Sequence, residues 1–415
     1  MNRFTATVLS VVAVLCFGGT FVQCMSKVCY YTDWSVYRQG PSGNFQPNDI
    51  DFSVCNYIMY SFVELDGETY NVKLADPWAD LPDGGGHGFI EKVIALAASN
   101  DAEVIVSLGG WTDSGHAAYG TLMTTDSLQV QFVQHVVAFI TKYGFKGLDI
   151  DYEYPQCPQG NCRPGDAEKK GFSKLLGKLR SEFNKHGFKL TAAVNSAADN
   201  IDKYYEAEAL NQNLDWIGMM TYDYAISSQP KVGLEAPFFQ FGSEPATWNV
   251  QASVEAWLSR GVSADKLVLG VPLYGASFTL ADASKNTIGS SASGPGSGGG
   301  PMFYNQICDL QNQGWTVVTE ENGKPIGGTY AYKDNQWVGY DDVSDVQAKG
   351  QYIKSKGLQG YMVWEVSGDD FKGLCGQGKY PLLSALSQSV GESKLLPSVS
   401  KKVNSLTYFY FLFFN

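Results

Sequence analysis

The sequence has little of what marks several large classes of protein. Only four histidines occur among 415 residues, and no two cysteines are spaced as Cys-x-x-Cys, so a zinc site is not expected. Basic residues number 30 against 42 acidic ones, and the net charge of −12 argues against nucleic acid or an anionic membrane as partner. The sequence contains no Asn-x-Ser/Thr sequon, so N-linked glycosylation is not expected either.

The composition that remains is that of a globular protein. Hydrophobic residues make up 44% and charged residues 17%, which is not the balance of a disordered chain. The length suits one large α/β barrel domain with an addition. Nine tryptophans and 24 tyrosines would suit stacking on sugar faces, although a hydrophobic core can use as many. A neutral polysaccharide is therefore compatible with both the charge and the aromatic content.

A secretory signal peptide is predicted at residues 1–24. Arg3 supplies its positive charge, residues 8–17 form its apolar run, and Val22 and Cys24 mark a plausible cleavage point. The apolar run is shorter than the roughly 20 residues that a transmembrane helix needs. We therefore expect a secreted, extracellular protein with no transmembrane segment.

Cysteine usage agrees with an oxidising compartment. Two of the eight cysteines, Cys16 and Cys24, lie within the predicted signal peptide. The other six are even in number, as expected for disulfides outside the cell. They are Cys29, Cys55, Cys157, Cys162, Cys308 and Cys375.

One run of acidic residues carries most of the chemical information. Asp149, Asp151 and Glu153 are spaced two apart in a β-branched and aromatic segment, residues 147–155, which predicts a strand. Alternation along a strand puts all three carboxylates on one face, roughly 6.5–7 Å apart. Such a group titrates as a unit, and at least one member should keep its proton well above an ordinary carboxyl pKa. A protonated acid beside ionised neighbours is what a glycosidase uses as general acid.

A solvated edge strand and a calcium site are the competing interpretations of this run. Phe145, Leu148 and Ile150 surround the acids with core-type residues. That context is unusual for a solvated edge, since buried charges are costly without a task or a partner. Catalysis is the interpretation that the local sequence favours.

Strand-like runs alternate with helical stretches along most of the chain, which predicts an α/β fold, a closed (β/α)₈ TIM barrel. The catalytic residues of such a barrel lie at the carboxyl ends of its strands, where the acidic run, Met220 to Asp223 and Trp364 all fall. Strands are expected at 28–31, 57–62, 103–108, 147–151, 189–194, 216–221, 267–272 and 360–364. Helices are expected at 89–99, 166–185, 250–260 and 381–388, and one more helix is expected to begin near Asp126.

One segment interrupts this alternation. About 85 residues separate Tyr274 from Gly360, too many for a single βα unit, so a small α+β insertion domain is expected between strands seven and eight, beside the barrel mouth. Its Gly/Ser-rich stretch 289–301 is expected to be a flexible linker and not a phosphate-binding loop, since no Gly-Lys-Ser/Thr follows. The predicted domains are 1–24 as signal peptide, 25–276 with 351–390 as barrel, 277–350 as insertion, and 391–415 as linker and apolar tail.

Five ordered motifs give the chain a family resemblance that covers nearly all of the mature sequence. Besides the acidic strand 147–155, they are residues 28–34, 107–111, 220–223, 270–280 and 361–364. Together they resemble the strand motifs of the family-18 chitinases, whose animal-type branch has an α+β insertion after strand seven. The resemblance implies substrate-assisted, retaining hydrolysis of β-1,4-linked N-acetylglucosamine, with chitin and chitooligosaccharides as partners and no cofactor or metal.

The resemblance also implies a role for each site residue. Glu153 would protonate the leaving oxygen, Asp151 would stabilise the cation formed by the substrate acetamide, and Asp149 would set the charge of Asp151. Tyr222 would hold the acetamide oxygen and Asp223 would contact the same sugar. Further groove residues implied are Tyr31, Trp34, Phe62, Trp111, Met220, Tyr274 and Trp364. Any one of these aromatic residues alone is about as often core as platform.

Two disulfides are implied by the resemblance, Cys29–Cys55 and Cys308–Cys375, and with those given Cys157 and Cys162 remain for the third. The chain departs from the family pattern at Lys146, Tyr152 and Ala276, and in residues 224–227. Strand alternation puts Lys146 on the face opposite the three acids, so it is expected to point away from the barrel interior.

Two other functions share this fold. Chitinase-like lectins keep the groove but usually lose the acid, which is present here as Glu153, and endoglycosidases acting on N-glycan cores differ only in groove shape. A chitinase is favoured because the residue types for acid catalysis are intact.

A monomer is expected. The apolar run 406–414 is shorter than the roughly 10–20 apolar residues of a lipid-anchor signal. A flexible tail is therefore favoured over an anchor signal or a membrane-interface or self-association segment.

Overall fold

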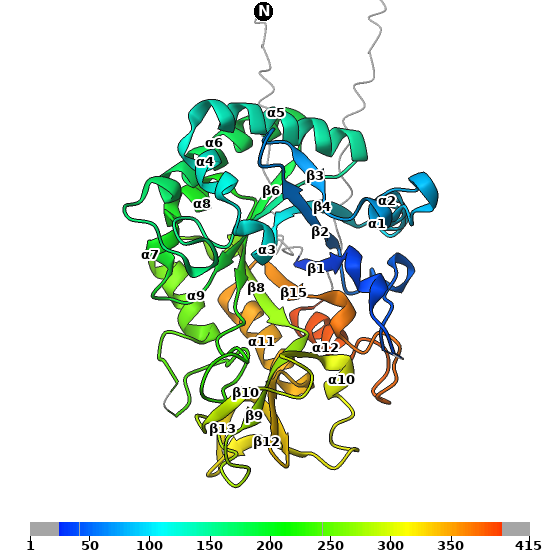
Figure 1. Ribbon diagram of the computed structural model, residues 1–415, viewed down its shortest axis with the longest axis vertical. Helices are drawn as coiled ribbons and strands as arrows, with labels where there is room; N and C mark the ends of the chain where they lie inside the picture. The colour runs from blue at the N-terminus through cyan, green and yellow to red at the C-terminus, as the bar shows by residue number, and fades with distance from the viewer. Residues whose placement is uncertain (1–24, 41, 243, 392–415) are drawn as a thin grey trace, which may run out of the picture.

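The computed structural model describes residues 25–40, 42–242 and 244–391, and within them the chain forms a closed barrel with a second sheet on one side of it (Figure 1). The barrel strands are all parallel, and β1 pairs with both β15 and β2, which closes the ring. In chain order they are β1 (Ser26–Thr32), β2 (Tyr57–Leu65), β4 (Glu103–Gly109), β5 (Gly147–Asp151), β6 (Lys189–Asn195), β7 (Trp216–Met220), β8 (Leu267–Pro272) and β15 (Gly360–Trp364). The predicted TIM barrel is confirmed.

The barrel strands are buried on both faces. Every residue of β1, β5 and β8 is buried, as expected when the barrel interior covers one side and helices cover the other. A short strand, β3 (Val72–Leu74), pairs antiparallel with the far end of β2. Because apolar residues occupy both faces, these strands read as continuous hydrophobic runs in the sequence.

Helices connect most of the barrel strands on the outside. The helices are α1 (Pro77–Asp80), α2 (Phe89–Ser99), α3 (Gly110–Ser114), α4 (Ala117–Thr124), α5 (Asp126–Tyr143), α6 (Ala167–His186), α7 (Ile201–Tyr204), α8 (Ala207–Asn213), α9 (Val250–Ser259), α10 (Tyr304–Ile307), α11 (Val343–Lys356) and α12 (Pro381–Val390). Between β1 and β2, in contrast, the described residues form only two 3₁₀ turns, η1 (Asp33–Tyr37) and η2 (Pro47–Asp49). Asp126 begins α5, as the sequence predicted, and forms an ion pair with Lys178 at 2.6 Å.

The second sheet is antiparallel and has the strand order β10-β9-β14-β13-β12, with β11 also on β9. Its strands are β9 (Tyr274–Leu280), β10 (Ala292–Pro295), β11 (Pro301–Phe303), β12 (Thr316–Glu321), β13 (Lys324–Lys333) and β14 (Gln336–Tyr340). The sheet thus begins at Tyr274, three residues before the expected boundary at 277. The last strand of the sheet, β14, ends at Tyr340. The helix that follows, α11, packs chiefly on α12 and therefore belongs with the barrel helices.

The Gly/Ser-rich stretch 289–301 is not a simple linker. Residues 292–295 form β10, which pairs antiparallel with β9, and Thr279 Oγ1 donates to the carbonyl oxygen of Pro295 at 2.7 Å. The edge of β9 leaves backbone groups unpaired, and β10 satisfies them. The expectation of a flexible linker is therefore wrong for these residues.

Three disulfides join Cys29 to Cys55, Cys157 to Cys162, and Cys308 to Cys375. The first and third are those that the resemblance implied, and the second is the pair that remained. Among the described residues, no helix has the length and hydropathy that crossing a bilayer requires. The predicted signal peptide and nearly all of the predicted tail, residues 1–24 and 392–415, lie outside the described residues.

Candidate active site

A cavity of about 170 Å³ opens at the carboxyl ends of the barrel strands. Carboxyl groups, two phenols and several other aromatic rings converge on it from β1, β2, β4, β5, β7 and β15 or from the residues that follow them. The lining residues are Tyr30, Phe62, Trp111, Asp151, Glu153, Ala193, Met220, Tyr222, Asp223 and Trp364. Eight of the twelve predicted catalytic and groove residues therefore line one space, and Asp149, Trp34 and Tyr274 each contact one of the lining residues.

Glu153 lies two residues beyond the end of β5 and is held through its backbone. Its N–H donates to Ser114 Oγ at 2.8 Å, and its carbonyl oxygen accepts from the N–H of Gln159 at 2.7 Å. Burial and the nearby Asp223 charge raise the pKa of Glu153 to about 8, against a smaller lowering by hydrogen bonding with Tyr154. A carboxyl with this pKa is mostly protonated at neutral pH and can donate a proton in the cavity.

Asp149 and Asp151 share a strand face but have different surroundings. Asp149 accepts three hydroxyl hydrogen bonds, from Tyr30 at 2.8 Å, Ser107 at 2.8 Å and Thr191 at 2.7 Å. These bonds favour the charged form, although burial raises the pKa of Asp149 overall. Its carboxylate is fixed by partners on three strands.

Asp151 is 4% exposed, and its Oδ1 is buried without a hydrogen-bond partner among the described residues. Burial first, and then the charges of Glu153 and Asp149, raise the pKa of Asp151 well above its usual range. A buried polar atom without a hydrogen-bond partner is rare in native structures, and such an atom usually has a catalytic role or binds a water, an ion or a ligand. Because Asp151 lines the cavity, a donor on a bound molecule is the partner that fits.

Aromatic rings form one wall of the cavity. Trp364 stacks on Phe62 with ring centroids 5.6 Å apart, and Trp34 stacks on the same Phe62 at 5.9 Å. Gly110, which directly follows β4, has φ +80°, and a Cβ there would lie 2.6 Å from the Phe62 ring. Only glycine therefore allows the backbone after β4 to lie so close to Phe62. Trp111, which follows, is 53% exposed at the mouth. Flat apolar faces at this mouth suit stacking on sugar rings.

The end of β7 and the residues that follow it also line the cavity. Met220, Tyr222 and Asp223 line the cavity, and Tyr274 Oη donates to Asp223 Oδ1 at 2.8 Å. Asp223 has φ +56°, in the left-handed region. This arrangement brings the Asp223 carboxylate close enough to raise the pKa of Glu153, which links the two sides of the cavity.

Tyr31 is not in the cavity, and its expected place is taken by Tyr30. Tyr31 is 0% exposed and packs among Phe45, Tyr60 and Phe89 between the barrel and its outer layer. Successive residues of β1 face opposite sides, so only one of two adjacent tyrosines can point inward. The expectation for Tyr31 is corrected to Tyr30, which also donates to Asp149.

Several other residues of the site were missed by the sequence reasoning. Glu235 accepts a hydrogen bond from the N–H of Asp223, and the signal that could have found it is an acid within the apolar run 232–237. Gln159 N–H donates to Glu153, and its Nε2 donates to the carbonyl oxygen of Trp111 at 2.8 Å, from within the Cys157–Cys162 loop. No local pattern marks Gln159, because both of its partners lie on other elements.

The departures from the family pattern lie outside the cavity. Lys146 is exposed and immediately precedes β5, as strand alternation predicted. Tyr152 Oη donates to Glu168 Oε2 at 2.8 Å, so the hydroxyl ties β5 to α6. Ala276 is 3% exposed in the core of the second sheet.

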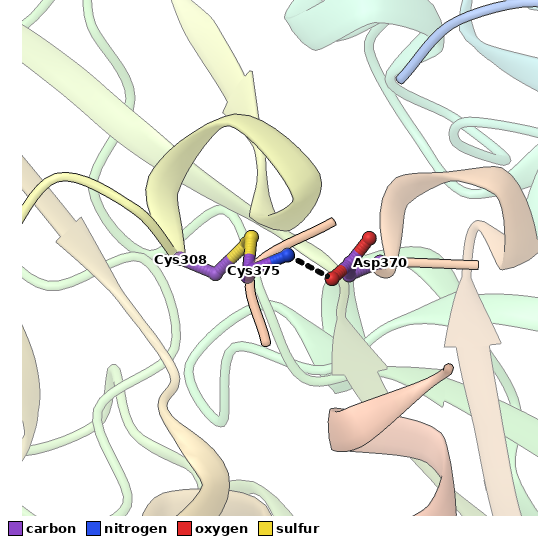
Figure 2. Close-up of side chains that lie close together, drawn as sticks. All are labelled: Cys308, Asp370 and Cys375. Carbon is purple, nitrogen blue, oxygen red and sulfur yellow. Dashed lines mark hydrogen bonds between the residues drawn. A yellow bond between two sulfur atoms is a disulfide. The ribbon is translucent and has the colours of Figure 1, made fainter. Parts of the chain in front are cut away.

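A further group, Cys308, Asp370 and Cys375, has its potential ligand atoms within 4.8 Å of one another (Figure 2). The two sulfurs are joined to each other, so neither is a free thiolate. Asp370 accepts the N–H groups of Leu374 and Cys375 at 2.9 and 2.8 Å. The group therefore holds a loop against α10, and its chemistry is that of a capped turn beside a disulfide.

Comparison with known proteins identifies the family. Residues 26–369 match the profile described as glycosyl hydrolases family 18. The protein named "Probable chitinase 10" of Drosophila melanogaster is 38% identical over 369 residues, which cover 87% of this chain but only 16% of that longer protein. Catalytic domain 2 of the Ostrinia furnacalis Group II chitinase, solved as a mutant in complex with (NAG)5, has a TM-score of 0.84 at 38% identity, over 88% of this chain and 96% of that one.

A binding protein without catalysis has the same fold. Human YKL-39, described as a pseudo-chitinase with retained chitooligosaccharide binding, has a TM-score of 0.78 at 30% identity, over 88% of this chain and 99% of that one. The match to the family profile covers the whole barrel and the second sheet, with the acidic strand and its cavity inside it. This chain belongs to the glycosyl hydrolases of family 18.

Proposed function

We propose that this protein is a secreted chitinase that hydrolyses β-1,4-linked N-acetylglucosamine polymers and oligomers, with Glu153 as general acid and base. The observation that carries the proposal is the Glu153 carboxyl, which lines the cavity and has a pKa raised to about 8. It therefore holds its proton at the pH where a glycosidic oxygen must be protonated. Family membership and the relatives named chitinases supply the substrate class.

The chemistry proposed needs no carboxylate nucleophile. Glu153 gives its proton to the leaving oxygen while the acetamide oxygen of the substrate attacks the anomeric carbon, which breaks the glycosidic bond and forms a cyclic oxazolinium. Water then loses a proton to the Glu153 carboxylate and opens the ring with net retention. Family 18 is a known exception to the usual scheme of two carboxylates.

Asp151 is proposed to stabilise the cation. Its buried Oδ1 lacks a partner, and the acetamide N–H of a bound sugar would supply one. Positive charge develops on the acetamide as the ring forms, and a carboxylate within the cavity stabilises it far better than water would. Asp149, fixed by three hydroxyl groups, is proposed to hold or share the proton that sets the charge of Asp151, so that Asp151 is a carboxylate when the proton is on Asp149.

The aromatic wall is proposed to bind the sugar chain. Trp364 and Phe62 would form the floor, with Tyr222 and Asp223 bonding the same sugar from the other side. Exposed rings continue along η1 and α1: Trp34 is 37% exposed, and Tyr37 and Trp78 stack with centroids 5.9 Å apart. A row of exposed rings is how a protein binds an extended polysaccharide with little charge.

The substitution Glu153→Gln tests the proposal. Hydrolysis of chitooligosaccharides should fall by about 10²–10⁴-fold or more, because the amide cannot give up a proton, while binding and thermal unfolding stay unchanged. Retention of most of the activity would exclude Glu153 as the acid. Wild-type protein that binds these oligomers without cleaving them would instead be a lectin of the YKL-39 kind.

Secretion and a monomeric state are parts of the same proposal. Three disulfides within the described residues fit an oxidising compartment. Light scattering of the secreted protein would test the monomer, and amino-terminal sequencing would test cleavage after residue 24.

A further inference from the structure

A second buried carboxyl lies beside the cavity, next to Asp223. Glu235 is 1% exposed, whereas Asp223 is exposed and lines the cavity. The backbone N–H of Asp223 donates to Glu235 Oε1 at 2.6 Å, and the two side chains are also hydrogen-bonded to each other. Two carboxyl groups can share a hydrogen bond only when one of them carries a proton.

Burial and the Asp223 charge favour that proton on Glu235, against the hydrogen bonds from the Asp223 N–H and from Tyr274. From β9, Tyr274 Oη donates to Asp223 Oδ1 at 2.8 Å, and its hydrogen bonding with Glu235 lowers the pKa of Glu235, as does the bond from the Asp223 N–H. From α11, Lys349 donates to the carbonyl oxygen of Ala236, but its charge is paired with Asp341. Burial and the neighbouring Asp223 charge raise the pKa of Glu235 well above its usual range.

We infer that Glu235 is a positioning residue for the proposed hydrolysis: as a neutral acid it holds Asp223 through two hydrogen bonds and keeps the Asp223 carboxylate directed at Glu153. The inference rests on the proposed function. Asp223 adopts φ +56°, which non-glycine residues rarely adopt unless their surroundings hold them there. The bond from its N–H to Glu235, and that of Tyr224 N–H to the Glu235 carbonyl oxygen at 3.0 Å, hold this turn.

The consequence reaches the catalytic acid. After burial, the Asp223 charge is the main cause of the raised pKa of Glu153. A displaced Asp223 would leave Glu153 more acidic, so less of it would be protonated at neutral pH. Glu235 thus acts on the reaction through Asp223, without touching the substrate itself.

Two substitutions separate the hydrogen bonds from the charge. Glu235→Gln keeps an acceptor for the Asp223 N–H and a donor for its carboxylate, and it is neutral like the protonated acid. Glu235→Leu has similar volume and removes both bonds. Glu235→Asp, one methylene shorter, serves the same purpose if the leucine variant does not fold. The pH dependence of kcat/KM on chitooligosaccharides is measured for each, with thermal unfolding alongside.

The leucine or aspartate variant should move the basic limb of kcat/KM down by about one pH unit, and the glutamine variant should keep the wild-type limb within about 0.3 units. The inference would be overturned if the basic limb of kcat/KM lay at the wild-type pH in both the leucine and the aspartate variants. A glutamine variant whose limb moves down as far would also overturn it, since that would mean a charged Glu235 acting by its own field. Failure of the proposed function is separate: it would show as an inactive wild type, or an active Glu153→Gln variant.

Discussion

Two of the pairs of carboxyl groups with raised pKa values, Asp33 with Asp80 and Asp151 with Glu153, differ in their access to a cavity. Asp33 in η1 and Asp80 in α1 are 1% and 0% exposed, and their side chains are hydrogen-bonded to each other. Burial raises the pKa of Asp33 to about 9 and that of Asp80 to about 6. Asp151 and Glu153 are raised by the same cause, but both line the cavity.

The difference lies in what satisfies each pair. Asp33 and Asp80 each have an oxygen without another partner, and one shared proton satisfies both. Tyr60 completes the bonding of Asp80, and the core closes around the pair. Asp151 keeps an unpartnered oxygen at an open cavity. A raised pKa alone therefore does not identify a catalytic acid, and access to a substrate-sized space decides.

The largest effect expected from this comparison is on activity. Glu153 must be protonated to act, so kcat/KM should fall about tenfold per pH unit above pH 8, where its raised pKa lies. Titration of Asp33 at higher pH should leave no separate mark on the activity profile. The pH profile on a soluble chitooligosaccharide measures this. A basic limb centred near pH 5 would mean that the acid has an ordinary carboxyl pKa.

The second prediction concerns stability. Because the folded-state pKa of Asp33 is raised from 3.8 to about 9, its contribution to stability is fully present below the lower value and is lost as pH rises through the higher one. Asp33→Asn keeps a donor for Asp80 and cannot ionise. At about 1.4 kcal/mol per pH unit, it should therefore gain up to about 5 kcal/mol in the free energy of unfolding relative to wild type between pH 5 and pH 9.

Urea unfolding at several pH values measures this gain. The activity profile of Asp33→Asn should stay that of the wild type, since the pair does not face the cavity. A pH-independent difference in stability would show that Asp33 is ionised in the folded state.

The smallest effect is expected at Lys146. It is exposed at the amino end of β5, and roughly 17 Å of strand separates residues 146 and 151. Screening at physiological salt removes most of an interaction over that distance. Lys146→Asp should therefore move neither limb of kcat/KM by more than about 0.3 units, and stability by no more than about 0.5 kcal/mol. A displacement of one unit or more would show coupling between this end of the strand and the acids.

The sequence alone determined the parts of this protein that depend on local pattern. The spacing of Asp149, Asp151 and Glu153 indicated one face of a strand with core residues around it, and the structure places two of them in the cavity with the third behind. The alternation of strands and helices determined the barrel, because each element must bury an apolar face against the next. The even number of cysteines after residue 24 indicated disulfides.

Tertiary structure alone decided which side chains meet. All seven residues of β1 are buried, so its sequence does not show whether Tyr30 or Tyr31 faces inward. Asp33 and Asp80 are 47 positions apart in the chain, and Asp223 and Glu235 are 12 apart across a loop. Each acid alone resembles any surface carboxyl in the sequence. Only folding brings the two members of a pair close enough to share a proton, because that interaction needs a hydrogen-bond distance that no local pattern specifies.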